Sequence, residues 1–236
     1  MSGTPSEPPD DLKARIKASY DAIGPAYNSW TIYNPSRRLA FLDKVLALIP
    51  PSSTTTTTSA SPDGSPPLIR VLELGCGAGV PVTERLLNDG RFHVTANDIS
   101  TSQVMLGRAL CGGTGRAEWR EGDMMALEFG DGEFDVVLGF YSLIHLPREE
   151  QAVMLGRIAR WLRPGRGLAL LNFAAEDMEG VVMERWFGER GWMYWSGWGA
   201  ERTLEKIVEA GLTVVSSEVS QDDVDAAFLW VIARAP

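Results

Sequence analysis

Apolar positions recur along most of this chain at the spacing of helices or strands. Near the N-terminus, residues 11–30 carry apolar side chains at three- and four-residue steps, which is typical of a helix with one buried face: Leu12, Ile16, Tyr20, Ile23 and Tyr27. Because Gly24-Pro25 interrupts this pattern, we predict two short helices there. A similar pattern predicts a helix over residues 35–49, which Pro50-Pro51 ends.

Beyond residue 67 the chain alternates between two kinds of pattern. Short apolar runs typical of buried strands cover residues 69–74, 93–97, 117–121, 134–140 and 167–173. Helical patterns lie between them, over residues 81–88, 101–110 and 148–162. Strands that alternate with helices predict a parallel sheet with helices on both of its faces.

The C-terminal region predicts a different strand arrangement. A helix over residues 201–210 precedes two strands, over residues 213–219 and 226–233, and the link between them is short. Two strands joined by so short a link must be antiparallel. The predicted fold is therefore α/β: a Rossmann-like, doubly wound, mostly parallel seven-stranded sheet with an antiparallel C-terminal strand.

Sequence composition divides the chain into a tail and one domain. Residues 1–10 are polar and proline-rich and predict a disordered tail, and residues 11–236 predict a single domain. Within this domain, residues 11–50 predict N-terminal helices that lie over the functional site. Residues 51–67 are a low-complexity run of Ser, Thr and Pro, which predicts a surface loop; a phosphorylated regulatory segment is the alternative.

Charge and cysteine content narrow the functional classes. The net charge of −9 and the absence of a long basic cluster argue against nucleic acid or an anionic membrane as a partner. No apolar run approaches the roughly 18–20 residues that span a bilayer, and the N-terminus lacks a signal-peptide pattern, which predicts a cytoplasmic protein. The two cysteines, Cys76 and Cys111, suggest neither a disulfide framework nor a zinc site.

A glycine-rich segment follows the first predicted strand. That strand runs directly into Gly75-Cys76-Gly77-Ala78-Gly79 and then into a helix. Glycines allow a ligand to approach the backbone closely, and a helix N-terminus offers free N–H groups. The dinucleotide fingerprint Gly-x-Gly-x-x-Gly fails, because Val80 stands at its last position when counted from Gly75. A purely structural turn is the alternative.

Five segments in order resemble the class I S-adenosylmethionine-dependent methyltransferases. Residues 73–79, read as Glu-x-Gly-x-Gly-x-Gly, resemble their motif I. The others are Asn97-Asp98-Ile99-Ser100, Gly122-Asp123-Met124, residues 134–141 and Arg160-Trp161-Leu162-Arg163-Pro164-Gly165. The resemblance implies S-adenosylmethionine as cofactor, Asp98 on its ribose hydroxyls, Asp123 on its adenine amino group and Met124 on the ring.

A narrower resemblance covers the N-terminus. Residues 19–27 are similar to the "YD-x-x-A-x-x-Y" start of many small-molecule methyltransferases, with Gly24 where alanine is usual. The resemblance implies that this helix folds over the cofactor and that Tyr20 lies beside the methyl group; buried core tyrosines are the alternative. The candidate cofactor-binding residues are Tyr20, Tyr27, Glu73, Gly75, Cys76, Gly77, Gly79, Asp98, Ile99, Gln103, Asp123, Met124, Phe140 and Tyr141.

Of the two histidines, His145 is the candidate general base. Pro147 suits the first turn of a helix, so His145 falls in the loop after the fourth strand, and its unperturbed pKa lies near neutrality. A role in shaping that loop is the alternative. His93 lies within a predicted strand and reads as structural. The candidate catalytic residues are therefore His145 and Tyr20.

Residues 174–200 form an insertion rich in aromatic side chains and methionine. We interpret it as a lid over an apolar or aromatic substrate; a satellite core or a dimer contact is the alternative. The candidate substrate-binding residues are Trp30, Tyr33, His145, Trp186, Trp192, Tyr194 and Trp195.

These patterns together predict an enzyme. It would transfer a methyl group by SN2 displacement to an oxygen, sulfur or nitrogen of a small, apolar or aromatic acceptor and release S-adenosylhomocysteine, as a monomer or homodimer. No metal cluster accompanies the fourth motif, so no metal is expected. A cofactor-binding scaffold and a non-transferase enzyme on the same fold are the alternatives.

Overall fold

The computed structural model describes residues 4–33, 36–50, 67–221 and 226–236. A seven-stranded sheet forms its centre, in the order β4-β3-β2-β5-β6-β10-β9. The strands are β2 (Ile69–Leu74), β3 (Phe92–Asp98), β4 (Ala117–Glu121), β5 (Val136–Gly139), β6 (Leu168–Ala174), β9 (Thr213–Gln221) and β10 (Ala227–Arg234). Only β10 runs antiparallel to its neighbours β6 and β9, whereas β2 to β6 pair in parallel. The predicted fold class is confirmed.

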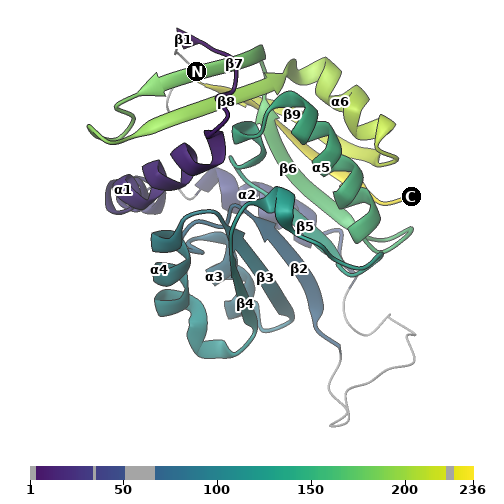
Figure 1. Ribbon diagram of the computed structural model, residues 1–236. Helices are drawn as coiled ribbons and strands as arrows, with labels where there is room; N and C mark the ends of the chain where they lie inside the picture. Colours follow the sequence, from purple (N-terminus) through teal and green to yellow (C-terminus); the bar gives the residue numbers. More distant parts are fainter. Residues whose placement is uncertain (1–3, 34–35, 51–66, 222–225) are drawn as a thin grey trace.

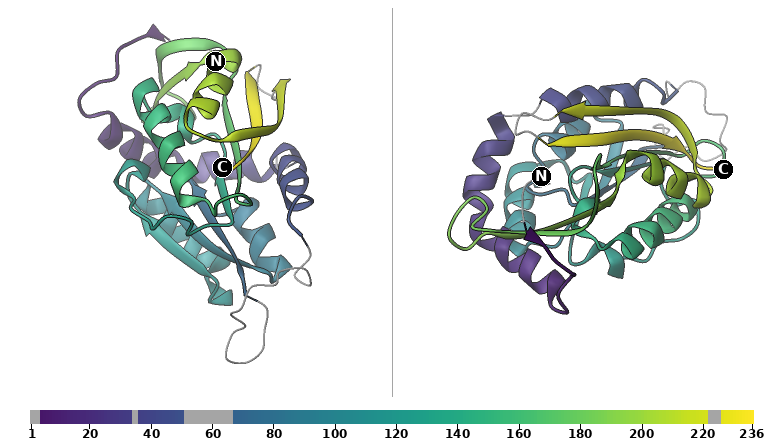
Figure 2. Two further views of the ribbon diagram at one scale, coloured as in Figure 1. Left: turned by 90° about the vertical axis from the view of Figure 1, so that its right-hand side faces the viewer. Right: turned by 90° about the horizontal axis from the view of Figure 1, so that it is seen from above.

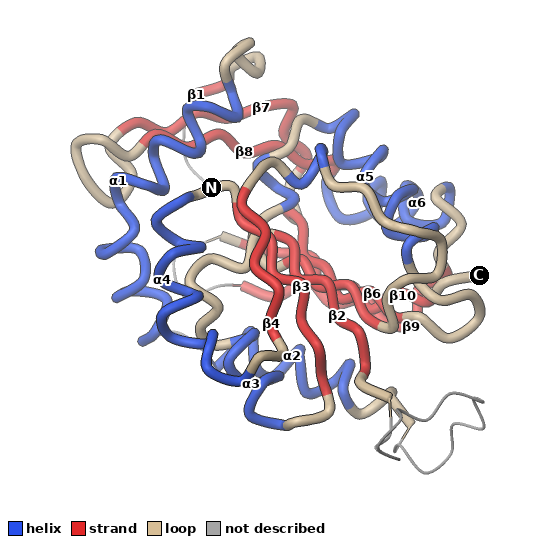
Figure 3. The backbone as a smooth tube through the Cα atoms, turned by 60° about the horizontal axis from the view of Figure 1, so that its bottom comes forward, coloured by secondary structure: helices blue, strands red, loops and turns tan. Residues whose placement is uncertain are grey.

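Helices cover both faces of this sheet (Figure 3). α2 (Ser36–Leu46), α3 (Val82–Asp89) and α4 (Thr101–Cys111) belong to one side, and α5 (Arg148–Trp161) and α6 (Gly199–Glu209) to the other, whereas α1 (Leu12–Tyr33) packs against α4 and β8 (Trp192–Trp198). Successive strand residues alternate between the two cores: Val71 and Leu138 pack with α2 and α3, whereas Leu72 and Val137 pack with α5. This alternation explains the continuous apolar runs in the sequence.

The insertion after β6 folds into a hairpin that the sequence patterns did not predict. β7 (Asp177–Glu184) pairs antiparallel with β8 (Trp192–Trp198), and β1 (Thr4–Pro5) adds a short third strand. Aromatic side chains occupy the hairpin without strict alternation, which hid its strand character. The prediction of a disordered tail over residues 1–10 was wrong from Thr4 onward, because β1 and the Ser6 N–H pair with β7 and Gly180.

The N-terminal helix also differs from the prediction. α1 is continuous from Leu12 to Tyr33 and contains Pro25, so the expected division into two helices was wrong. Proline removes one backbone hydrogen bond, but packing on both flanks of Pro25 offsets that loss: Ile23 is buried, and Tyr27 packs on the hairpin.

α1 and the hairpin lie across one end of the sheet (Figure 1). Seen from above, the tip of the β7–β8 hairpin reaches the side of α1 (Figure 2). The glycine-rich turn after β2 opens at the same end, because the carboxyl ends of parallel strands share one edge of a sheet. The predicted low-complexity loop lies outside the described residues except for Pro67, and so does the acidic segment 222–225.

Candidate functional site

The glycine-rich turn after β2 is built for close approach. Gly75 and Gly79 have φ values of 70° and 76°. A Cβ on Gly75 would lie 2.3 Å from the Cβ of Ser142, and one on Gly79 would lie 2.7 Å from the Trp119 ring. The hydroxyl of Ser142 donates to the Leu74 carbonyl at 2.7 Å, which holds the loop after β5 against the turn. Glycine is therefore required at both positions.

A cavity opens between this turn, α1 and the loop after β5, and we call it the loop cavity. It brings together most of the predicted cofactor-binding residues: Tyr20, Tyr27, Gly75, Gly77, Asp98, Ile99, Gln103, Asp123, Met124, Phe140 and Tyr141. Glu73 and Cys76 instead line a small adjoining cavity behind the turn. Gly79 lines neither cavity and serves packing against Trp119.

Asp98, at the end of β3, is the most connected carboxylate of the loop cavity. Its two oxygens accept hydrogen bonds from the N–H groups of Gly77 (2.8 Å) and Ser100 (2.9 Å). Burial raises the pKa of Asp98 to about 6, and these two hydrogen bonds partly oppose that rise. Asp98 is therefore largely ionised at neutral pH and keeps lone pairs for a ligand hydroxyl.

Gln103, on the first turns of α4, faces the same cavity. Its side chain is 1% exposed, yet neither its amide oxygen nor its amide nitrogen has a hydrogen-bond partner within the described part of the chain. Because a buried amide without partners is costly, a polar group of a ligand is the expected partner. Asp123 lies farther along the cavity, where its carboxylate accepts from the Met125 N–H and approaches Lys13.

Tyr20 and His145 form a hydrogen-bonded pair. The Tyr20 hydroxyl lies 2.9 Å from His145 Nε2, and His145 Nδ1 lies 2.8 Å from the carbonyl oxygen of Tyr194. A carbonyl can only accept, so Nδ1 carries the proton and donates it, and Nε2 accepts from Tyr20. Burial lowers the pKa of His145 to about 4 and raises that of Tyr20 well above its ordinary value. Both side chains are therefore neutral at physiological pH.

A second, larger cavity lies on the other side of this pair, and we call it the aromatic cavity. Its volume is about 320 Å³, within the range of small-molecule sites. Four side chains line both cavities: Tyr20, Tyr27, Tyr141 and His145. The remaining wall is mostly aromatic and comes from α1, the hairpin and β10: Trp30, Trp186, Phe187, Trp195 and Phe228. A ligand in one cavity would thus meet a ligand in the other at the Tyr20–His145 pair.

Two buried polar side chains shape the junction, by which we mean the wall that the loop cavity and the aromatic cavity share. Neither was a candidate site residue from the sequence. Asn172 accepts from the Tyr141 N–H at 2.6 Å and so supports the left-handed backbone of Tyr141, whose φ is 55°. Arg38 is 8% exposed and lies 4.9 Å from the Tyr141 ring. It lines both the aromatic cavity and the small cavity beside Glu73. In the sequence Arg38 is only the second residue of the pair Arg37-Arg38, and nothing in that local pattern indicates that its side chain is buried.

The predicted substrate-binding residues separate into two groups. Trp30, Trp186, Trp195 and His145 line the aromatic cavity. Trp192 and Tyr194 do not: Trp192 packs under Arg15, and Tyr194 is fully buried and contributes its carbonyl to His145. The side chain of Tyr33 lies outside the described residues. His93 lies on β3 away from both cavities.

Two features of the described residues bear on other functional classes. No helix there is both long enough and apolar enough to cross a membrane. No group of three or more His, Cys, Asp or Glu side chains in those ranges is arranged to hold a metal ion.

Comparison with known proteins gives consistent matches. Residues 71–165 match the sequence model of a family described as "Methyltransferase domain". The chain is 34% identical over 124 residues to the 2-methyl-6-phytyl-1,4-hydroquinone methyltransferase of Synechocystis, covering 52% of this chain and 38% of that protein. It is 33% identical over 109 residues to the O-methyltransferase cnsE of Penicillium expansum, covering 45% and 38%. The matched segments therefore span less than half the length of these relatives.

A solved structure matches over nearly the full length. The magnesium protoporphyrin IX methyltransferase ChlM of Synechocystis with bound S-adenosylmethionine superposes with a TM-score of 0.64 at 16% identity, over 98% of this chain and 100% of that one. At this identity the likeness establishes the shared fold.

Proposed function

Because this chain belongs to the class I S-adenosylmethionine-dependent methyltransferases, we propose that it transfers a methyl group from S-adenosylmethionine to a hydroxyl of a small aromatic acceptor. The observation that carries this proposal is the neutral Tyr20–His145 pair on the wall that the loop cavity and the aromatic cavity share. One cavity suits the cofactor and the other the acceptor.

The residues of the loop cavity fit the chemistry of the cofactor. The carboxylates of Asp98 and Asp123 suit the ribose hydroxyls and the adenine amino group, and the unpartnered amide of Gln103 suits a further polar group of the nucleoside. Arg38, a buried cation beside the glycine-rich turn, suits the carboxylate of the methionine part. When bound, S-adenosylmethionine supplies an electrophilic methyl group on a positively charged sulfur.

The aromatic cavity supports an aromatic acceptor without positive charge. Its lining contains eight aromatic rings besides His145, and no Asp or Glu of the described residues contributes to it. A protonated amine would lose its water there without gaining a carboxylate, and Arg38 would repel it. The stacked and edge-on rings favour a flat apolar body and exclude water from the reaction.

His145 supports a hydroxyl as the accepting group. The Tyr194 carbonyl holds the proton on Nδ1, so the lone pair of Nε2 faces the junction and can take the proton of an acceptor hydroxyl in place of that of Tyr20. Tyr20 and Tyr141 then position the acceptor oxygen, and positioning is the larger contribution to a displacement reaction. Among the curated relatives, the name of the Penicillium O-methyltransferase also supports an oxygen acceptor, and that of the Synechocystis hydroquinone methyltransferase supports an aromatic substrate without naming the accepting atom.

The test supplies labelled S-adenosylmethionine with panels of phenols, thiols and amines. We expect label on a phenol, and we expect His145→Gln to lower kcat by roughly 10²- to 10⁴-fold without changing the Kd for S-adenosylhomocysteine. His93→Gln on β3 is the matched control and should behave as wild type. Label on thiols or amines with an unaffected His145→Gln variant would refute the hydroxyl acceptor. Tight cofactor binding with no transfer to any acceptor would favour a scaffold or non-transferase role.

Two other sequence predictions also stay proposals: a cytoplasmic location, and a monomer or homodimer that acts on a small molecule and has neither nucleic acid nor a membrane as a partner. The net charge of −9 supports the absence of a nucleic-acid partner.

A further inference from the structure

We propose that Asp21 is a positioning residue that ties α1 to the N-terminus of α4, and that this connection couples cofactor binding at Asp98 to the placement of Tyr20. The proposal rests on the proposed function, because it assigns the loop cavity to the cofactor. It gives a role to a side chain that lines neither the loop cavity nor the aromatic cavity.

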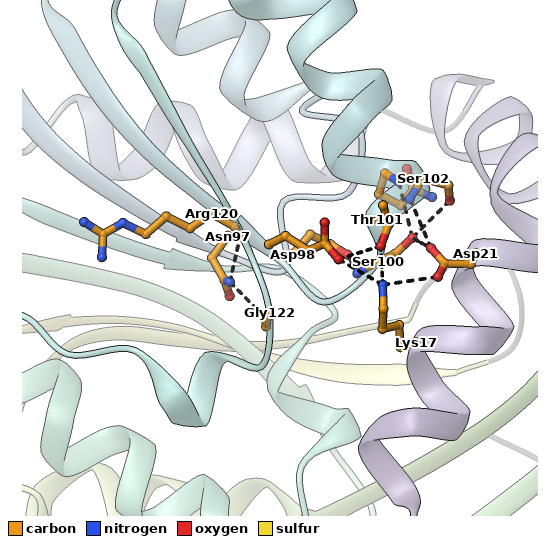
Figure 4. Close-up of polar contacts among 11 residues, drawn as sticks. Lys17, Asp21, Asn97, Asp98, Ser100, Thr101, Ser102, Arg120 and Gly122 are labelled. Carbon is orange, nitrogen blue, oxygen red and sulfur yellow. Dashed lines mark hydrogen bonds and ion pairs between the residues drawn. The ribbon is translucent and has the colours of Figure 1, made fainter.

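The first step is the contact between two helices. Asp21 Oδ1 accepts a hydrogen bond from the Ser100 hydroxyl at 2.7 Å and another from the Ser102 N–H at 3.0 Å (Figure 4). Ser100 is the N-cap of α4, so a carboxylate from α1 satisfies a free N–H at the positive end of another helix. Burial opposes ionisation of Asp21, but these hydrogen bonds and Lys17 hold its pKa below the usual value.

Lys17 reinforces this contact from one turn earlier on α1. Its ammonium group lies 3.3 Å from Asp21 Oδ2 and 3.2 Å from a carboxylate oxygen of Glu121 at the end of β4, and it also contacts the Thr101 hydroxyl (Figure 4). The Lys17 and Glu121 side chains are 36% and 42% exposed, so solvent screens this pair. The Asp21 side chain is itself 32% exposed, so solvent also screens its ion pair with Lys17. The more protected part of the contact is its hydrogen bond to Ser100, which is fully buried.

The second step is the connection from Asp21 to the glycine-rich turn. The Ser100 hydroxyl donates to Asp21, the Ser100 N–H donates to Asp98, and Asp98 also accepts from the Gly77 N–H. An unbroken series of hydrogen bonds thus joins α1 to the turn through the carboxylate assigned to the ribose. A cofactor that orders Asp98 also orders Ser100, and through it Asp21.

The position of Asp21 on α1 also affects the Tyr20–His145 pair. Tyr20 precedes Asp21 on α1 and lines the loop cavity together with Ile16 and Lys13, at the spacing of one helix face. Its hydroxyl reaches His145 on the far side of the cavity. Because α1 is one rigid helix, a shift at Asp21 moves Tyr20 relative to His145 and opens the wall over the cofactor.

Apolar packing alone could hold α1, since Leu12, Ile16 and Ile23 are buried. The test therefore compares variants that keep this packing. Asp21→Ala removes both hydrogen bonds, whereas Asp21→Asn keeps an accepting oxygen at the Oδ1 position and loses the charge and the Oδ2 acceptor that faces Lys17. Asp11→Asn, which affects an exposed ion pair with Arg15 at the start of α1, is the matched control.

We expect Asp21→Ala to raise the Kd for S-adenosylhomocysteine roughly tenfold, mainly through faster dissociation, as the loss of a capping interaction would do. Asp21→Asn should recover most of this affinity, and Asp11→Asn should match wild type. The readouts are calorimetry for the Kd and stopped-flow tryptophan fluorescence for the dissociation rate. For turnover, the KM for the cofactor should rise by a larger factor than kcat falls.

Three outcomes overturn the proposal. If Asp21→Ala is folded and binds and releases S-adenosylhomocysteine as wild type does, Asp21 has no positioning role, although the proposed function stands. If wild type itself binds no S-adenosylhomocysteine, both fail. Should Asp21→Ala not fold, Ser100→Ala removes the hydroxyl hydrogen bond to Asp21 together with the N-cap on the Gln103 N–H, and it should raise the Kd; no rise refutes the coupling.

Discussion

Glu73 shows at the residue scale how burial sets the properties of a single carboxyl group. Glu73 is only 4% exposed and lies in the core, where its carboxyl group accepts a hydrogen bond from the Thr83 hydroxyl. Burial raises its pKa to about 7, while Thr83 and Arg38 partly offset that rise. The folded-state pKa thus exceeds the ordinary value of 4.5, so stability from this group is present below pH 4.5 and is lost as the pH rises through 7.

Glu73→Gln should therefore stabilise the cofactor-free protein at pH 8 much more than at pH 5. A glutamine keeps an acceptor for Thr83 and never carries charge, and at ~1.4 kcal/mol per pKa unit the gain at pH 8 is at most about 3 kcal/mol. Urea unfolding at the two pH values measures it. Glu205→Gln, at an exposed position on α6, is the control. An equal effect at both pH values would contradict the role assigned to burial.

The hydrogen bond between Tyr20 and His145 is a second feature at the residue scale that depends on tertiary packing. Each residue could be chosen from the sequence as a site candidate, but their separation by 125 positions in the chain concealed their hydrogen bond. The tautomer of His145 depends on a backbone carbonyl of the hairpin, which no local pattern indicates. The local sequence indicated both side chains as candidates, and tertiary packing determined that they form a hydrogen-bonded pair.

At the scale of elements, α1 is the feature in which a local rule and the tertiary structure disagree. Pro25 lies in its interior at an exposed position and cannot donate to the Asp21 carbonyl. Aromatic contacts hold the helix together beyond it: Tyr27 lies 5.6 Å from Trp186, and Trp30 lies 5.6 Å from Phe187, between ring centroids. Helix continuity is therefore a product of packing against the hairpin.

We expect Pro25→Ala to raise the free energy of unfolding by about 1–3 kcal/mol. Alanine restores the missing N–H and has the higher helix propensity, while the greater freedom of the unfolded chain offsets part of the gain. Denaturant unfolding checks this. A variant that unfolds at the same or a lower urea concentration would mean that the contacts with the hairpin need the backbone conformation that proline imposes.

At the scale of the whole molecule, the cofactor would join parts of the chain that are far apart in sequence. The loop cavity takes residues from α1, the turn after β2, the end of β3 and the loop after β5. A ligand that binds only this assembled site stabilises the folded state by RT ln(1 + [L]/Kd), or ~2.7 kcal/mol at 100 times Kd. For a chain of this size that corresponds to a rise in Tm of roughly 5–10 °C.

Thermal unfolding with saturating S-adenosylhomocysteine should show this rise at pH 7.5 and a smaller one below pH 6. The pKa of Asp98 is about 6, so its carboxylate is protonated at the lower pH and can no longer accept from both ribose hydroxyls and the backbone N–H groups. Asp98→Asn should show a small rise at both pH values. A pH-independent rise in wild type would exclude Asp98 as the ribose ligand.

The sequence by itself determined the order of strands and helices, the sheet class and the glycine-rich turn. β2 and β4 begin and end where the apolar runs predicted, over residues 69–74 and 117–121. These features rest on interactions within a few residues: alternation across the sheet, capping by Ser100 and glycine at positive φ. Asp98 and Asp123 follow from the same local order, since Asp98 ends β3 and Asp123 lies two residues beyond the end of β4.

Only the tertiary structure decided the continuous α1, the β7–β8 hairpin and the composition of the two cavities. It placed Arg38 and Asn172 at their junction and turned Trp192 and Tyr194 away from the aromatic cavity. The physical reason is that these features depend on contacts between side chains far apart in the chain. A run of aromatic residues shows that apolar surface must be buried, but its partners are chosen only when the elements pack.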